Sequence, residues 1–165
     1  MGTTTATTAS CQPLAGGSLT PQKSPAEMNL ATQYLTEVSI DQKTCSDQVV
    51  FKFEGAHASG YDVSYQPAGT AKVEDASGKP VTIAGDAFLV VKLSPAMTAK
   101  IEGDQVTKTY TGPGRLPAEN PLDEVVKTGD FESVVTWVIG LDQKRRFTAS
   151  VSGSEVVVEI DHTLP

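Results

Sequence analysis

Short runs in which apolar and polar residues alternate fill the chain from about residue 32 to the C-terminus. A period of two residues places every second side chain on the same face of an extended chain, so it predicts β-strands rather than helices. In QVVFKFEG (48–55), for example, Val49, Phe51 and Phe53 share one face. Turn-forming residues end each run, and the runs recur at the ~8–12-residue spacing that is typical of sandwiches and barrels.

About nine strands are expected. They are drawn from eleven alternating or apolar runs, some of them short, at 32–40, 48–55, 60–67, 70–76, 81–85, 86–95, 99–103, 121–131, 133–141, 145–152 and 154–162. Only MNLATQYL (28–35) and the stretch around 96–100 leave room for a turn or two of helix. Strands with one apolar face must bury it in two layers or in a closed barrel. We therefore predict an all-β fold for residues 32–165: an antiparallel β-sandwich or flattened barrel.

The segment FESVVTWVIGLDQKRRF (131–147) holds the only tryptophan and a cluster of basic residues. It is either a ligand surface or a hairpin with Trp137 in the core. Residues 134–139 are apolar on both faces, which favours a central strand and a buried Trp137. The run 86–95 is likewise expected to be covered on both faces. Residues 140–144 then form a hairpin turn, with one following arginine in solvent and the other paired with an acid at a rim.

Residues 1–27 consist mostly of Thr, Ala, Ser, Gly and Pro, with almost no periodic apolar content. Such a segment buries too little surface to offset its ordering entropy, so we expect residues 1–31 to form a flexible tether. No signal peptide is visible. Thr-rich tethers commonly follow the lipidated cysteine of bacterial lipoproteins, so we expect that an export signal and an anchoring cysteine have been removed. The alternative is a cytosolic protein with a disordered N-terminus.

The two cysteines, Cys11 and Cys45, have neither CxxC spacing nor neighbouring histidines, so they do not indicate zinc. In an oxidising compartment they would pair and fasten the tether to the domain, contributing roughly 3 kcal/mol. A second interpretation makes Cys11 the lipidated residue of Thr-Ala-Ser-Cys. Thr8 stands where Leu is usual and no apolar stretch precedes it, so the disulfide is the favoured interpretation.

The net charge of −7 argues against nucleic acid or an anionic membrane surface as a partner. No apolar segment approaches the ~20 residues of a membrane-spanning helix, so only a removed lipid anchor would connect the protein to a membrane. The candidate metal ligands Asp41, Asp47, Asp161 and His162 show no recognisable spacing. The glycines of 110–117 follow no strand–helix unit that would cradle a phosphate. We expect no metal and no cofactor.

Three stretches are similar to a known family. DQVVFKFEG (47–55), preceded by TEVSI, resembles the opening of AMIN domains. GDAFLVVKLSPA (85–96), GDFESVVTWVIGLDQKRRFTASV (129–151) and EVVVEIDH (155–162) resemble the AMIN-like domain of actinobacterial envelope lipoproteins. The resemblance covers roughly residues 34–162, and its most specific portion is GDFESVVTWVIGLDQKRRF.

This resemblance implies a β-sandwich in an exported, often lipid-anchored protein of the cell envelope. AMIN domains proper are non-catalytic targeting modules that associate with peptidoglycan and with division or secretion machinery. The resemblance therefore implies peptidoglycan, another glycan or an envelope protein as the partner, and it supplies no catalytic residues. Cys45 is not part of the family pattern.

Enzymatic chemistry is weakly indicated. His57 lies in the loop GAHASG, and Ser59 beside it is not in a GxSxG elbow. His162 is expected to be a terminal polar residue rather than a base. The carboxylate pairs Asp123–Glu124 and Asp130–Glu132 are able to act on a sugar, but with 20 acidic residues such pairs also arise by chance.

Two functional classes remain. A binding module would use an aromatic platform for sugar rings, and Tyr61, Tyr65 and Tyr110 are the candidates, with Arg115 as a polar handle. In the favoured structural alternative, Tyr61 and Tyr65 pack on one face with their hydroxyls at the rim. The second class is a small-ligand carrier or hydrolase that uses a pocket between the sheets, with His57 in it.

Overall fold

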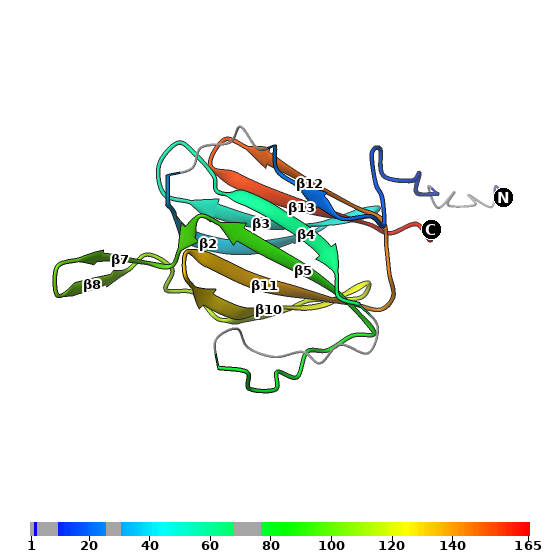
Figure 1. Ribbon diagram of the computed structural model, residues 1–165. Helices are drawn as coiled ribbons and strands as arrows, with labels where there is room; N and C mark the ends of the chain where they lie inside the picture. Colours follow the sequence, from blue (N-terminus) through cyan, green and yellow to red (C-terminus); the bar gives the residue numbers. More distant parts are fainter. Residues whose placement is uncertain (1, 3–9, 26–30, 68–76) are drawn as a thin grey trace.

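Two packed sheets form the domain in the computed structural model, which describes residues 2, 10–25, 31–67 and 77–165 (Figure 1). The six-stranded sheet has the order β1 (Gln22–Lys23), β4 (Gly60–Tyr65), β5 (Ala87–Ser94), β11 (Val134–Leu141), β10 (Leu122–Phe131) and β9 (Arg115–Pro117). The five-stranded sheet has the order β12 (Phe147–Ser152), β13 (Glu155–Asp161), β3 (Ser46–Phe53), β2 (Gln33–Gln42) and β6 (Ala96–Met97). The pairings within both sheets are antiparallel apart from β2 with β6. The predicted all-β sandwich is confirmed.

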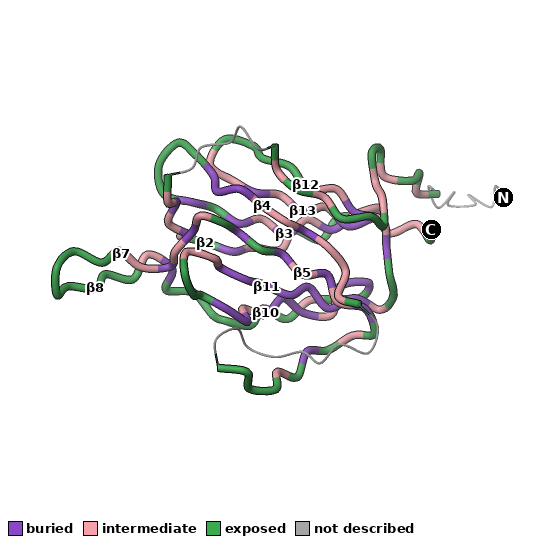
Figure 2. Tube along the Cα trace, viewed as in Figure 1, coloured by how far each residue is buried: buried purple, intermediate pink, exposed green. Residues whose placement is uncertain are grey.

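The two-residue alternation of the sequence is also the alternation of burial. On β3, Val49, Phe51 and Phe53 are buried against the facing sheet, as the pattern predicts. Trp137 lies on the central strand β11, between β5 and β10, and has no exposed surface. Its ring packs against Phe51 of the other sheet with centroids 6.1 Å apart. Figure 2 shows the buried positions along the strands that face each other. Trp137 is therefore a core residue.

The segment that follows β11 corrects one prediction. β11 belongs to the six-stranded sheet and β12 to the five-stranded sheet, so residues 142–146 cross between the sheets and form no hairpin. Arg145, which is 7% exposed, holds this crossing. Its guanidinium donates to both carboxylate oxygens of Asp142 at 2.8 Å and to the carbonyl of His162 at 2.7 Å. The hydrogen bonds with Arg145 lower the pKa of Asp142. Arg145 thus pairs with an acid, as was expected of one arginine, but Arg146 does not extend freely into solvent: it lies 3.5 Å from the Asp161 carboxylate and donates to the carbonyl of Leu164 at 2.8 Å.

Two further strand predictions need correction. β5 is buried on one face only, because its other face is partly covered by residues 81–83 and partly exposed. Residues 81–85 form no strand; Ile83 instead packs on Val126 and Val138 as a small second core. An apolar alternating run cannot by itself distinguish a strand from an extended loop that covers a sheet. The run 70–76 lies outside the described residues.

Part of the N-terminal segment belongs to the folded domain, although residues 1–31 were expected to be a tether. Gln22 and Lys23 form β1, which pairs with β4. The Gln22 side chain also donates to the carbonyl of Phe147 at 2.7 Å and accepts from Ala149 N at 2.9 Å, so it connects the six-stranded sheet to β12. This attachment uses polar and backbone groups, which hydrophobic periodicity does not report. Residues 1, 3–9 and 26–30 lie outside the described part.

A disulfide and a buried carboxylate fasten the start of this segment. Cys11 and Cys45 are bonded, with Cα atoms 5.3 Å apart, as predicted. Asp161, which is fully buried, accepts from Leu14 N at 2.9 Å and from Thr163 N at 2.8 Å. Burial acts to raise the pKa of Asp161, but hydrogen bonds from Leu14, Thr163 and Arg146 outweigh it, and the net pKa is lowered.

Acid is expected to remove the stability that the Asp161 carboxylate contributes. Because its pKa is lower in the folded protein than in the unfolded chain, the contribution is present above about pH 4 and is lost as pH falls through the folded pKa. Asp161→Asn should therefore destabilise the protein at pH 7 and approach the wild type near pH 2. Urea unfolding of both proteins at the two pH values measures this. An equal difference in stability between Asp161→Asn and the wild type at both pH values would contradict the stabilising role of the carboxylate.

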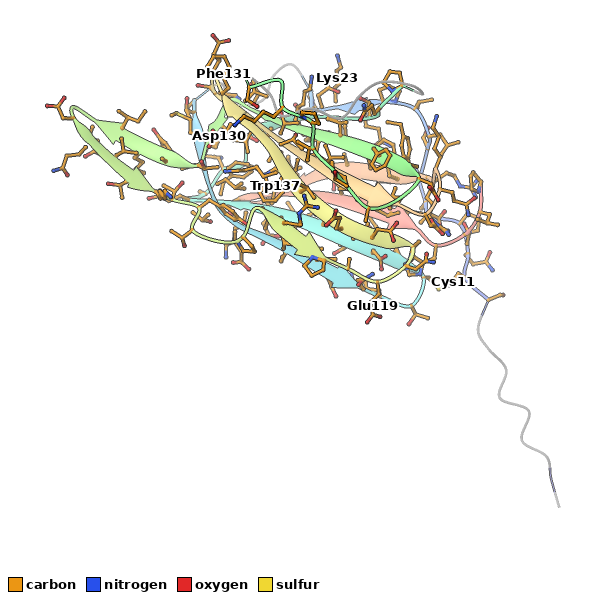
Figure 3. The ribbon with its side chains drawn as sticks, turned by 90° about the horizontal axis from the view of Figure 1, so that it is seen from below. Cys11, Lys23, Glu119, Asp130, Phe131 and Trp137 are labelled. Carbon is orange, nitrogen blue, oxygen red and sulfur yellow. A yellow bond between two sulfur atoms is a disulfide. The ribbon has the colours of Figure 1, made fainter. Side chains whose placement is uncertain are left out.

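A hairpin of β7 (Ala99–Glu102) and β8 (Gln105–Lys108) projects from one end of the sandwich (Figure 1). The C-terminus lies at the opposite end in this view. Figure 3 shows the hairpin extending away from Cys11, with Asp130 and Phe131 towards the hairpin end and Trp137 between the sheets. The described residues contain no helix long and apolar enough to cross a membrane.

Candidate functional site

Tyr61 and Tyr65 lie on β4 and point their hydroxyls at the other sheet. Tyr61 donates to the carbonyl of Ala149 at 3.0 Å and Tyr65 to that of Arg145 at 2.5 Å. Burial raises the pKa of both phenols, although contacts with Arg145 partly offset the shift at Tyr65. Both rings pack against the core. This is the structural alternative that the sequence analysis favoured, with two tyrosines that tie the sheets together.

Tyr110 is only 7% exposed and offers no open ring face to a sugar. Its ring meets Trp137 edge to face, with centroids 5.6 Å apart and an interplanar angle of 86°. The hydroxyl donates to the carbonyl of Pro113 at 2.5 Å, and burial raises its pKa. Gly112 lies against this ring: a Cβ there would stand 2.9 Å from the Tyr110 oxygen. Tyr110 therefore closes the end of the core above Trp137.

Arg115 fixes a loop instead of projecting as a free handle. It pairs with the carboxylate of Glu124 and donates to the carbonyl of Thr82 at 3.0 Å. The same Glu124 oxygen accepts from Ala84 N at 2.8 Å. Arg115 and Glu124 together hold residues 82–84 against the sheet. Since β4 and β9 lie near opposite edges of the six-stranded sheet, the structure does not bring the four predicted site residues together.

A groove of about 560 Å³ lies at the base of the β7–β8 hairpin, and of the four predicted binding residues only Tyr110 lines it. Its walls come from the hairpin, from the loop after β8 and from β10. The residues that matter for its chemistry are Thr98, Val106, Lys108, Tyr110, Lys127 and Asp130. The Thr98 hydroxyl donates to the Asp130 carboxylate, which joins the hairpin base to β10. The groove therefore combines two ammonium groups, one carboxylate and an apolar wall.

The position of Lys127 follows from the register of β10. Lys127 pairs with Trp137 and Val125 with Ile139, so Lys127 shares the core-facing side of its strand with the fully buried Val125. A register shift follows between Lys127 and Gly129. A lysine at the end of a core-facing row keeps its ammonium in water by extending out of the mouth of the sandwich. Sequence reasoning missed Lys127 and Lys108, because an isolated lysine carries no distinctive signal.

The residues considered for acid–base and metal chemistry have structural contacts. His162 Nε2 lies 2.9 Å from Asp47 Oδ1, and its Nδ1 lies 3.0 Å from the carbonyl of Thr44. His162 thus contacts Asp47 and Thr44 beside the Cys11–Cys45 disulfide, so its side chain is held although it lies near the C-terminus. His57 is exposed and does not line the groove. Among the described residues, no group of three or more His, Cys, Asp or Glu side chains is placed to hold a metal ion.

The two predicted carboxylate pairs are also separated by their contacts. Glu124 is bound to Arg115, whereas burial and the nearby carboxylates of Asp142, Asp86 and Glu124 raise the pKa of Asp123. Asp130 is bound by Thr98, and Glu132 lies in the turn between β10 and β11 with a φ of 52°. The groove, rather than these pairs, is the place where side chains of different character converge.

Comparison with known proteins identifies the family. The family model described as the AMIN-like domain matches residues 33–162. This match spans both sheets from β2 to β13, and it includes the hairpin and the groove. No curated protein and no solved structure matches the chain. The chain belongs to the AMIN-like domain family.

Proposed function

We propose that this protein is a non-catalytic module of the cell envelope, exported and lipid-anchored, that binds peptidoglycan through the groove beside the β7–β8 hairpin. Membership of the AMIN-like family supports the envelope location. The Cys11–Cys45 disulfide supports export, because disulfides persist in oxidising compartments. The groove is the observation that carries the binding role, since it gathers polar and apolar groups at a free end of the domain.

The position of the groove fits an anchor on the N-terminal side. The N-terminal segment meets the domain at Cys11, whereas the hairpin extends from the far end (Figure 3). A lipid anchor ahead of Cys11 would therefore hold the domain at the membrane and direct the hairpin and the groove away from it. An envelope polymer on that side would then reach the groove without obstruction. An envelope protein is the other partner class that this geometry would accept.

The interior between the sheets supports a binding module more than a carrier with an internal pocket. The facing residues fill the space with large apolar side chains that have no exposed surface, Trp137, Phe51, Phe53 and Phe147 among them. The groove opens at the end of this core, where Tyr110 covers Trp137. A ligand would thus bind at the surface, beside the hairpin.

The full chain is expected to co-sediment with purified peptidoglycan sacculi. Arg115→Ala should be retained like the wild type, because Arg115 fixes a loop outside the groove. Tyr110→Ala is a poor probe, since it removes the cover of Trp137 and perturbs the core. The measurement is the bound fraction against sacculus concentration, with an unrelated protein of similar net charge as the control. Retention of the wild type no greater than that of this control would overturn the proposed function.

A further inference from the structure

We propose that the groove recognises a peptide stem of peptidoglycan by its free carboxylate, with Lys108 and Lys127 binding the carboxylate and the Val106 face of the hairpin contacting small apolar side chains. This inference rests on the proposed function and adds the part of the polymer that is recognised. It concerns residues on β8 and β10 that are far apart in sequence and line one groove.

The two lysines have no carboxylate partner within the described part of the chain, and both line the groove. Lys100, on the opposite face of the same hairpin, shows the contrast: it pairs with Glu54 at 2.9 Å. In a chain of net charge −7, two unpaired ammonium groups in one groove form a local exception to the overall charge. Hydrogen bonds between ammonium and carboxylate are the stronger, charge-assisted kind, so an anionic group is the expected occupant.

The hairpin supplies an apolar wall next to these charges. Ile101 pairs with Val106 and Ala99 with Lys108, so alternation puts these four side chains on one face of the hairpin. Ala99, Val106 and Lys108 line the groove, and Ile101 extends the same face outward. Val106 is 66% exposed and Ile101 61% exposed. Two large apolar side chains this exposed on one face have surface to bury against a ligand.

The combination fits a peptide better than a sugar ring. Stacking on a sugar needs an open aromatic face, and Tyr110, the aromatic residue of this groove, is buried against Trp137. A peptide stem offers alanine methyl groups for the Val106 face and a terminal carboxylate for the lysines. The Asp130 carboxylate, bound by the Thr98 hydroxyl, has further acceptor capacity for an amide N–H or an ammonium group of the stem. Each kind of group in the groove thus has a complement in the ligand.

Isothermal titration calorimetry with three soluble probes tests this inference: a disaccharide–peptide with a free C-terminal carboxylate, the same compound with that carboxylate amidated, and the disaccharide alone. The wild type should bind the first and bind the second roughly a hundredfold more weakly, because the charge-assisted contacts of both lysines are lost. The disaccharide alone should not bind measurably. Binding of the disaccharide as tightly as of the first probe would overturn the peptide assignment.

Lys108→Gln and Lys127→Gln should each weaken binding of the free carboxylate probe roughly tenfold and should each reduce the difference in affinity between the two peptide probes to roughly tenfold, because one lysine remains. Lys92→Gln is the matched control, because Lys92 is an exposed lysine on β5 outside the groove. The affinity of this variant for the free carboxylate probe should differ from that of the wild type by less than about twofold. All three variants should unfold at the wild-type urea midpoint. Sacculus binding by the wild type with unchanged affinity in both groove variants would overturn this inference and leave the proposed function standing. No binding of the wild type to sacculi or to any probe would overturn both.

Discussion

Replacing Trp137 by alanine is expected to lower the free energy of unfolding by about 3–5 kcal/mol, the range for truncating a large buried aromatic residue. Trp137 has no exposed surface, and its ring contacts Phe51 of the opposite sheet and Tyr110 at the end of the core. Truncation would leave a cavity where three aromatic rings meet. Domains of this size are typically stable by about 5–15 kcal/mol, so the change removes a large share of the total.

Trp137→Phe is the matched control for that experiment. The indole Nε1 of Trp137 is buried and has no hydrogen-bond acceptor among the described residues. Phenylalanine therefore loses ring volume but no hydrogen bond, and it removes an unsatisfied donor whose burial is costly. We expect a loss below about 2 kcal/mol. Urea unfolding followed by far-UV circular dichroism measures both variants, and an alanine variant within about 1 kcal/mol of the wild type would contradict the central packing of Trp137.

Reducing the Cys11–Cys45 disulfide is expected to lower the free energy of unfolding by about 3–4 kcal/mol. The bond joins residues separated by 34 positions, and opening a loop of that length restores considerable entropy to the unfolded chain. The native contacts of the segment remain available after reduction, including the hydrogen bond from Leu14 N to Asp161 and the pairing of β1 with β4. The reduced domain should therefore stay folded in water and unfold at a lower urea concentration.

The measurement compares urea unfolding of the wild type with and without reductant. A Cys11→Ser, Cys45→Ser double variant serves as the control: it should unfold near the reduced wild-type midpoint and should not respond to reductant. If the wild type unfolds at the same midpoint in both conditions, the disulfide contributes nothing to stability. Intact mass, which differs by two hydrogens between the oxidised and reduced forms, verifies the state of the cysteines.

The main strands and the core can be predicted from the sequence because the burial of apolar side chains determines both. Val49, Phe51 and Phe53 alternate with polar residues, and burying their shared face requires a second layer. The same logic places Trp137 in the interior, since its strand is apolar on both faces. Where burial does not decide the structure, prediction from periodicity fails. The N-terminal segment is held by a disulfide, a buried carboxylate and the amide of Gln22, none of which depends on apolar alternation.

Hydrophobic periodicity also fails to predict two other features: the segment that crosses from one sheet to the other, and the groove. A polar segment after a strand, such as residues 142–146, has the same pattern whether it turns back as a hairpin or crosses to the other sheet. The outcome depends on the bidentate contact of Arg145 with Asp142 and on the partner strands, which are distant in sequence. The groove likewise depends on which strands meet at the hairpin base. Of the four predicted binding residues only Tyr110 reaches it, as cover for Trp137, and Asp130 from one of the predicted carboxylate pairs lines it as well.

The most direct test of binding at the hairpin end is amide chemical-shift mapping of the ¹⁵N-labelled full chain during titration with the soluble disaccharide–peptide. The predicted result is that the largest shifts fall on the β8 strand, on residues 111–114 and around Lys127, which surround the groove. Small shifts are expected around Tyr61 and Tyr65, which lie on β4. Largest shifts at β4, or along the β1 and β12 strands beside it, would contradict this placement and assign binding to the opposite edge of the sheet.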